Sequence, residues 1–177
     1  MRIGVLAVQG AFIEHELAFQ RAGHEVFEIR QLKDIERPFD LLVLPGGEST
    51  VQRKLLADLG LAEPLWAKID AGLSVFATCA GLILMAKTVD GAPNPLGRLD
   101  ITVTRNAYGR QLGSFNTHGP FLGHDDVPMT FIRAPKIESI DPQVEVLSTF
   151  DGYPTGVRQG NIIGLAWHPE LNGEIYI

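Results

Sequence analysis

The chain of 177 residues contains one cysteine, Cys79, and no long apolar run. A single cysteine cannot form an internal disulfide, and scarce cysteine is typical of proteins in a reducing compartment, so we expect a cytoplasmic location. No apolar stretch approaches the roughly 18 residues needed to span a bilayer, and the apolar segment at the N-terminus is too short for the core of a signal peptide. We therefore expect no membrane partner.

Basic residues are also scarce, because 15 Lys and Arg stand against 21 Asp and Glu and give a net charge of −6. No run of basic side chains is present, which argues against nucleic acid or an anionic membrane as the partner. The five histidines are scattered and there is no second cysteine, so the pattern indicates no metal site. No nucleotide-binding fingerprint is visible, and we expect no cofactor.

The length and the 45% hydrophobic content fit one globular domain over residues 1–177. In the first half, apolar strands are predicted over residues 3–8, 24–29, 40–44 and 74–77, and helices over 12–22, 49–58, 62–71 and from 82 onward. This alternation predicts an α/β fold with three layers, in which a flavodoxin-like, mostly parallel mixed sheet lies between helices.

Two details of these helices follow from the residue pattern. Ser49 or Thr50 is the expected N-cap of the second helix. The first helix is predicted from apolar residues at close to helical spacing, which are Phe12, Ile13, Leu17, Ala18 and Phe19.

The second half of the chain shows alternating apolar and polar residues, which is typical of antiparallel strands. A loop is expected at residues 90–97, and alternating strands over 99–105, 129–132, 144–150, 153–158 and 162–167, with a hairpin turn at 159–161. We expect these strands to extend the sheet in a short antiparallel part.

Three loops follow parallel strands and should meet at the carboxyl edge of the sheet, where such folds bind ligands. They are Gln9-Gly10, the glycine-rich segment 45–49, and the strand–turn–helix elbow at Cys79. An elbow of this kind presents its side chain at the tip and directs the first N–H groups of the helix toward it. These features predict a site built around a cysteine nucleophile.

A cysteine nucleophile needs a base and a group that orients the base. His168 follows the last strand, and Glu170 lies two residues further on, so Cys79, His168 and Glu170 are the candidate triad. The N–H groups of Gly47 and Ala80 are candidates for an oxyanion hole. From the residues alone, a buried structural cysteine, a surface His-Pro-Glu turn and an ordinary glycine turn stay open.

Segments 45–49, 78–82 and 167–170, in this order and at these separations, resemble a class I, triad-type glutamine amidotransferase domain. Segments 4–15, 44–50, 105–111 and 131–135 narrow the resemblance to the glutaminase subunits of pyridoxal 5′-phosphate synthase. The resemblance covers nearly the whole chain.

The resemblance implies that Cys79 attacks the carboxamide of L-glutamine, that His168 protonates the departing ammonia and that Glu170 orients His168. It implies two sets of substrate-binding residues, Gly47, Glu48 and Ser49 on one side and Arg105, Ile132 and Arg133 on the other. The resemblance also implies that the Gln9-Gly10 peptide lies near the oxyanion hole, and we hypothesise that a flip of this peptide on docking completes the hole.

The implied partner is a (β/α)8-barrel synthase subunit, which receives the ammonia, builds pyridoxal 5′-phosphate and activates the glutaminase by docking. Two alternatives stay open: a glutaminase serving another synthase, and a catalytically silent subunit that only binds glutamine. An intracellular peptidase of the same fold is disfavoured, because Ala80 stands where such enzymes place a histidine. The chain departs from the family pattern at Ala77, where glycine is usual, and at residues 116–118, where an acidic Glu-Ala is usual.

Overall fold

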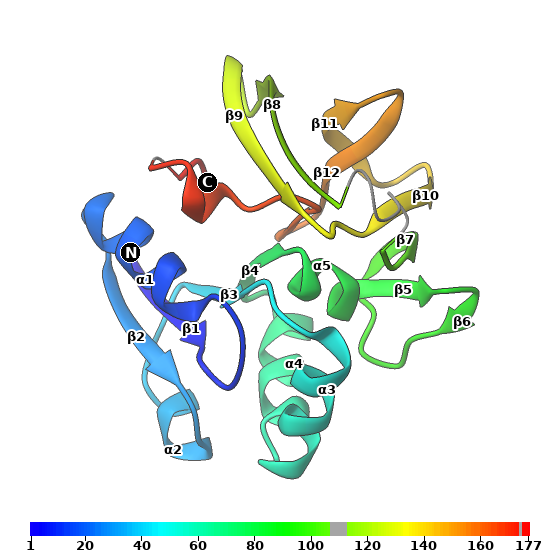
Figure 1. Ribbon diagram of the computed structural model, residues 1–177. Coiled ribbons are helices and arrows are strands. Elements are labelled where there is room, and N and C mark those ends of the chain that lie inside the picture. The colour runs from blue at the N-terminus through cyan, green and yellow to red at the C-terminus, as the bar shows by residue number, and fades with distance from the viewer. Residues whose placement is uncertain (107–112, 174) are drawn as a thin grey trace.

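A computed structural model describes residues 1–106, 113–173 and 175–177. Its largest sheet has seven strands in the order β11-β12-β13-β4-β3-β1-β2. The five strands from β13 to β2 are mutually parallel, and β12 and β11 extend the sheet as antiparallel strands. The predicted α/β fold with a mostly parallel mixed sheet and an antiparallel extension is confirmed (Figure 1).

The strands of the large sheet are β1 (Arg2–Leu6), β2 (Glu25–Ile29), β3 (Leu41–Leu44), β4 (Ser74–Thr78), β11 (Glu145–Phe150), β12 (Tyr153–Gln159) and β13 (Ile162–Leu165). The helices are α1 (Phe12–Arg21), α2 (Leu32–Ile35), α3 (Ser49–Asp58), α4 (Ala62–Asp70), α5 (Ala80–Met85) and the 3-10 turn η1 (Pro169–Leu171). The remaining strands are β5 (Ala86–Val89), β6 (Ala92–Pro93), β7 (Leu99–Thr104), β8 (Ser114–Phe121), β9 (His124–Ile132) and β10 (Lys136–Ile140).

The central strands form because their residues are apolar without interruption. All four residues of β3 are buried, as are the last four of β1 and of β4. A strand that is buried on both faces is typical of a parallel sheet covered by helices. The carboxyl ends of β1, β3, β4 and β13 therefore reach the same edge of the sheet, and the loops that carry the predicted site begin there.

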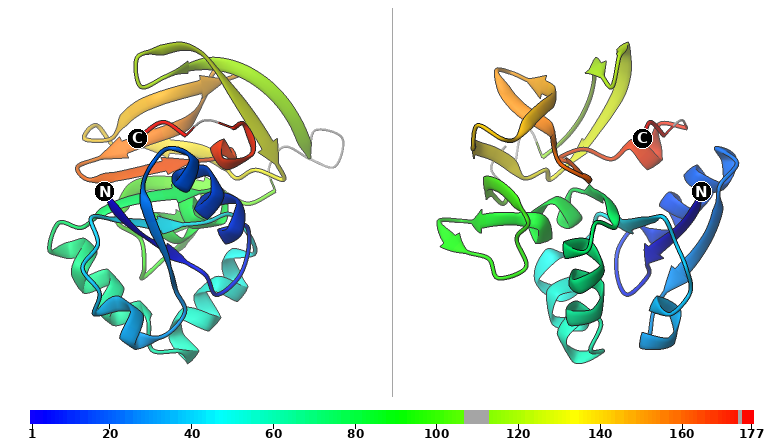
Figure 2. Two further views of the ribbon diagram at one scale, coloured as in Figure 1. Left: turned by 90° about the vertical axis from the view of Figure 1, so that its left-hand side faces the viewer. Right: turned by 180° about the vertical axis from the view of Figure 1, so that it is seen from behind.

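The second half of the chain differs from the prediction. Among the described residues of this half, β11, β12 and β13 alone join the large sheet, and β13 runs parallel to β4. The predicted strands at 99–105 and 129–132 were expected in that sheet, but they correspond to β7 in a four-stranded sheet and β9 in a hairpin with β8. The β8–β9 hairpin lies at the opposite end of the molecule from α3 and α4 (Figure 2).

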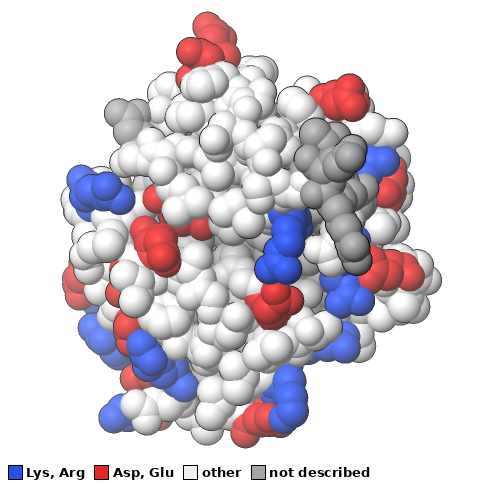
Figure 3. Space-filling view, viewed as in Figure 1, with Lys and Arg blue, Asp and Glu red and all other residues white. Residues whose placement is uncertain are grey.

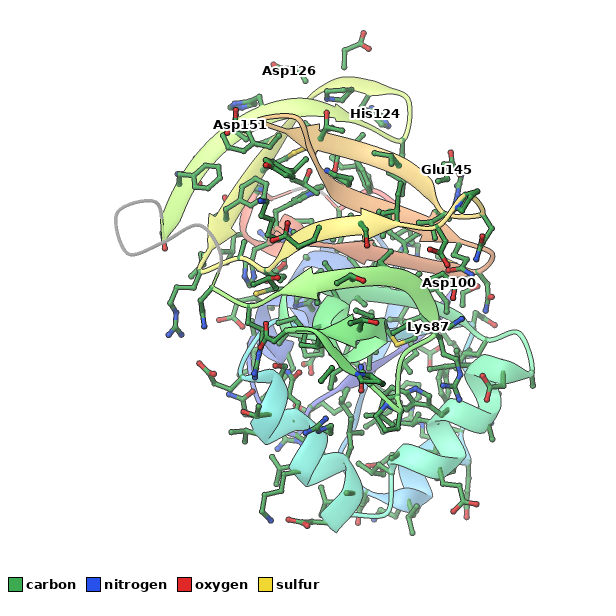
Figure 4. The ribbon with its side chains drawn as sticks, turned by 90° about the vertical axis from the view of Figure 1, so that its right-hand side faces the viewer. Lys87, Asp100, His124, Asp126, Glu145 and Asp151 are labelled. Atoms are coloured by element: carbon green, nitrogen blue, oxygen red, sulfur yellow. The ribbon has the colours of Figure 1, made fainter. Side chains whose placement is uncertain are left out.

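An acidic side chain joins the second sheet to the first. Asp100 on β7 accepts hydrogen bonds from the side chains of Gln143 and Gln159 and pairs with Lys87 on β5. Figure 4 shows Lys87 and Asp100 side by side on these neighbouring strands. The backbone N–H of Asp100 also donates to Gln159 Oε1 at 2.7 Å, so Asp100 links the second sheet to β12 of the first.

The helices show two details that the residue pattern did not give, and the expected N-cap is wrong. The buried face of α1 consists of His15, Ala18 and Phe19, whereas Ile13 and Leu17 are about half exposed. The N-cap of α3 is Glu48, so Ser49 is the first helical residue and caps nothing. The buried face of α1 thus includes a histidine, whose two ring nitrogens contact polar atoms inside the protein.

Charged side chains are mixed on the surface. Lys and Arg alternate with Asp and Glu over the face in Figure 3, with no large area of one sign. Across residues 1–106, 113–173 and 175–177, no helix combines the length and the apolar character needed to cross a membrane.

Candidate active site

A pocket of about 340 Å³ opens at the carboxyl edge of the large sheet. It is bordered by the loop after β1, the loop after β3, the elbow after β4, the end of β9 and the segments that follow β7 and β13. The residues that line it are Gln9, Ala11, Gly46, Gly47, Glu48, Ser49, Thr50, Cys79, Ile83, Arg105, Asn106, Ile132, Arg133 and His168. The three loops that the sequence places at this edge do converge here.

Cys79 occupies a strained turn between β4 and α5. Its backbone has φ 47° and ψ −100°, a conformation that costs a non-glycine residue of order 1–3 kcal/mol. Its N–H donates to Leu165 O on β13 at 2.8 Å, and its carbonyl accepts from Ile83 N at 3.1 Å. The side chain is 7% exposed, with Sγ 3.9 Å from Ile132 O. The predicted elbow is therefore present, and it presents the sulfur to the pocket.

His168 and Glu170 lie directly after β13. His168 Nδ1 is 2.7 Å from Glu170 Oε1, and both side chains are buried. Burial alone lowers the pKa of His168, but the contact with Cys79 and the hydrogen bond and charge of Glu170 outweigh it and raise this pKa to about 10. The imidazole is thus favoured in its protonated form beside the sulfur.

The loop that carries His168 is fixed from β9. His168 N donates to Thr130 O at 2.8 Å, and Thr130 Oγ1 donates to Asn172 Oδ1 at 2.7 Å. Asn172 Nδ2 in turn donates to Pro128 O at 2.8 Å. These bonds hold both ends of the short turn that contains Glu170.

Gly46 lies between the cysteine and the histidine. A Cβ added to Gly46 would lie 2.4 Å from His168 Cε1 and 3.4 Å from Cys79 Cβ. The absence of a side chain at this position therefore lets His168 and Cys79 approach one another.

The two glycine-containing loops contact each other behind the pocket. Gly47 has a φ of 156°, and a Cβ added to this residue would lie 2.5 Å from Gln9 Oε1. Gly10 has φ 97°, and a Cβ there would lie 2.0 Å from Gly46 O. The fully buried Gln52 donates Nε2 to Gln9 O and to Pro45 O, each at 3.1 Å. The loops at Gln9-Gly10 and at Gly46-Gly47 thus form one unit.

Opposite charges face each other at the rim of the pocket. Arg133 Nη2 is 3.1 Å from Glu48 Oε1, and both side chains are more than half exposed, so the pair is weak and free to separate. Arg105 lines the pocket as predicted, but its Nε is 2.6 Å from Asp90 Oδ2. Residues 107–111 of the predicted segment 105–111 lie outside the described residues.

The structure brings the predicted site residues into one region, with differences in how they reach it. Of the predicted residues, those that do not line the pocket are Gly10, Ala80 and Glu170. Ala80 is the fully buried first residue of α5, next to Cys79. Glu170 lies behind His168, where an orienting group belongs. Within the part of the chain that the structure describes, no cluster of His, Cys, Asp and Glu is arranged to hold a metal.

Sequence reasoning did not place one polar group that the structure puts beside the triad. His15 on α1 is fully buried, and its Nε2 is 3.3 Å from Glu170 Oε2. The signal was its spacing, because His15 precedes Ala18 and Phe19 by three and four residues and so shares their buried face.

Comparisons with known proteins support the family resemblance that the sequence motifs indicate. A model of the SNO glutamine amidotransferase family matches residues 5–176. The chain is 53% identical, over all of its length and 94% of the relative's, to the "Pyridoxal 5′-phosphate synthase subunit PdxT" of Methanocorpusculum labreanum. It is 55% identical, over 98% of its length and 88% of the relative's, to the protein of the same name from Desulfitobacterium hafniense.

Comparisons with solved structures indicate the same family and fold. A crystal structure described as a glutamine amidotransferase has a TM-score of 0.91 and 39% identity, covering 97% of this chain and 92% of the other. The structure of PurLQS from Thermotoga maritima, at 21% identity and a TM-score of 0.68 over 96% of this chain and 87% of the other, shares the fold. With the matched family model and the full-length relatives, this chain belongs to the SNO glutamine amidotransferase family.

Proposed function

We propose that this chain is the glutaminase subunit of a pyridoxal 5′-phosphate synthase, which hydrolyses L-glutamine and passes ammonia to a (β/α)8-barrel synthase subunit. The observation that carries the proposal is the strained Cys79 at the pocket, next to a buried His168–Glu170 pair 2.7 Å apart. The relatives named as subunits of that synthase match 98–100% of the chain at 53–55% identity, which supports this acceptor over another one.

In the proposed reaction, Cys79 Sγ attacks the carboxamide carbon of glutamine as a thiolate, and the proton on His168 passes to the leaving nitrogen. Ammonia departs and a thioester forms. Water, deprotonated by His168, then attacks the thioester and releases glutamate, and the proton returns to the histidine–cysteine pair. Glu170 keeps the imidazole in the tautomer and orientation that this proton transfer needs.

The pocket rim suits an amino acid with both charges. The α-carboxylate of glutamine is proposed to bind Arg133 or Arg105, and the α-ammonium Glu48, so that the exposed Glu48–Arg133 pair separates when substrate enters. Gly47 and Ser49 would hold the substrate from the same side as Glu48, and the Ile132 backbone would hold it from the other side.

The oxyanion hole is proposed to form from the N–H groups of Gly47 and Ala80, completed by the Gln9-Gly10 peptide. In this structure Gln9 O accepts a hydrogen bond from Gln52, which keeps that peptide in one orientation. A flip on docking of the barrel subunit would explain activation by the partner, and equal rates of glutamine hydrolysis by the free and the docked chain would contradict it.

The proposal covers residues 1–177 as one amidotransferase domain acting in the cytoplasm. The test is the release of glutamate from L-glutamine by the chain alone and with the purified barrel subunit, for wild type and Cys79→Ala. Strong activation by the barrel, abolished in Cys79→Ala, is expected. Activity that depends on Cys79 but ignores the barrel would leave a glutaminase serving another synthase, and activity that survives Cys79→Ala would refute the triad.

A further inference from the structure

His15 lies inside the protein but contacts polar atoms there instead of apolar ones alone. Its side chain is completely buried, and both ring nitrogens face polar atoms. Nδ1 is 2.7 Å from Ala11 O, while Nε2 is 3.0 Å from Thr78 Oγ1 and 3.3 Å from Glu170 Oε2. The triad carboxylate therefore lies between two histidines, with Oε1 on His168 and Oε2 facing His15.

The contacts fix the tautomer of His15. Ala11 O can only accept a hydrogen bond, so the ring proton is on Nδ1. Burial lowers the pKa of His15, against the opposing effect of the Glu170 and Glu14 carboxylates, so the ring is neutral. Nε2 then carries a lone pair, and it accepts the hydroxyl proton of Thr78.

This arrangement leaves one carboxylate oxygen without a donor. Among the described residues, Glu170 Oε2 is buried and has no hydrogen-bond partner. Leaving a buried acceptor unsatisfied costs about 1–3 kcal/mol, and such costs are typical of functional sites. The short contact of this carboxylate with a side chain is the one between Oε1 and His168 Nδ1, at 2.7 Å, and a second side-chain donor at Oε2 would compete with it.

We propose that His15 is a positioning residue of the triad, whose neutral ring, held by Ala11 and Thr78, fills the space beside Glu170 Oε2 and withholds a hydrogen-bond donor from it, so that the carboxylate stays turned toward His168. His15 does not line the pocket, so it acts through Glu170 and not on the substrate. The inference rests on the glutaminase activity proposed above for Cys79, His168 and Glu170.

The decisive variant is His15→Gln. The glutamine amide reaches the same region, but it presents an N–H that can donate to Glu170 Oε2 while its oxygen accepts from Thr78. The variant thus satisfies Thr78 and Glu170, and Ala11 O keeps the backbone N–H of residue 15 as a donor, so we expect the variant to fold. Because the new donor competes for the carboxylate, the pKa of His168 should fall from its raised value, and kcat should fall roughly 10–100-fold with little change in KM, the range found for groups that orient metal-bound histidines.

Three readouts follow the proposal. Glutamine hydrolysis in the complex with the barrel subunit separates kcat from KM, and 15N NMR of the imidazoles reports the titration of His168. The third is the rate of Cys79 alkylation by iodoacetamide at pH 7, which follows the thiolate population of the single cysteine and requires no glutamine. His15→Gln should slow the alkylation, whereas a role in packing alone would leave the titration and the alkylation unchanged.

Matched variants complete the test. Thr78→Val removes the hydroxyl that donates to His15 at nearly constant shape and should reproduce part of the loss, whereas Thr78→Ser should retain wild-type values. His24→Gln, at a half-buried histidine beside Phe19, should change nothing. Folded His15→Gln and Thr78→Val proteins with wild-type kcat and His168 titration would overturn the inference. Absence of glutaminase activity in wild type would instead overturn the proposed function, and the alkylation rates would still decide the role of His15.

Discussion

Replacing Gly46 by alanine tests whether the contact between Cys79 and His168 depends on the missing side chain. The backbone of Gly46 is outside the left-handed region, so alanine can adopt it. The added methyl group would nevertheless lie 2.4 Å from His168 Cε1 and 3.1 Å from its Nδ1. Non-bonded carbon atoms approach to about 3.5–4.0 Å, so the imidazole has to move by about 1 Å.

A displacement of this size has a large effect on chemistry and a small one on folding. A misplacement of about 1 Å can cost about 10²-fold in rate. We therefore expect Gly46→Ala to lower kcat for glutamine hydrolysis about 100-fold in the complex with the barrel subunit. The free energy of unfolding should change by only about 1 kcal/mol, because the smaller entropy of the unfolded chain offsets part of the strain.

The control is Gly119→Ala on β8, which also has no left-handed backbone. Its added Cβ would have Met129 Cε as nearest neighbour at 3.5 Å, an ordinary contact. This variant should retain the wild-type kcat and melting temperature. A folded Gly46→Ala enzyme with wild-type kcat would refute the argument that Gly46 makes room for His168.

Two further predictions concern charge. Glu170→Gln should bring the pKa of His168 down from about 10 and lower kcat about 10²–10⁴-fold, as measured by imidazole NMR and by glutamate release; an unchanged titration would contradict the role of the carboxylate. The hydrogen bond from Lys87, followed by those from two glutamine side chains, lowers the pKa of Asp100 to about 2. Because this carboxylate has a lower pKa in the folded than in the unfolded state, it stabilises the fold above pH 4, and the effect is lost as the pH falls toward 2. Asp100→Asn should therefore be about 1–2 kcal/mol less stable than wild type at pH 7, the value being limited by solvent around the half-exposed Lys87, and the difference should vanish near pH 2 in denaturant unfolding. A stability difference between Asp100→Asn and wild type that does not change with pH would refute this role of the carboxylate.

The first half of the fold was predictable because its strands are apolar on both faces. Strands β1, β3 and β4 are continuous apolar runs, and short polar or glycine-rich loops mark their ends. Strands β8 and β10 were not predicted, since β8 alternates exposed with half-buried positions and β10 buries only Ile137 completely. Their residues pack on neighbouring strands without an apolar alternation that the sequence displays.

The candidate site was predictable where it depends on the ends of strands. Cys79, the Gly46-Gly47 loop and His168 each follow a parallel strand, and the fold brings such positions together. His15 was not placed because it reaches the triad from the side of a helix, and only the packing of α1 against the turn at Glu170 brings it there. The Glu48–Arg133 pair joins residues 85 positions apart, and its geometry depends on the turn after β9.

The place of β13 in the sheet has a consequence for biosynthesis. This strand lies between β4 and β12. Strand β4, which precedes Cys79, can therefore pair with β13 only after residue 165 has been made. A ribosome has by then produced β1, β3 and the whole elbow, yet the nascent chain holds a thiol without its base. The pairing of β13 with β4, and the turn that follows it with His168 and Glu170, is thus among the last parts of the site to be assembled during translation.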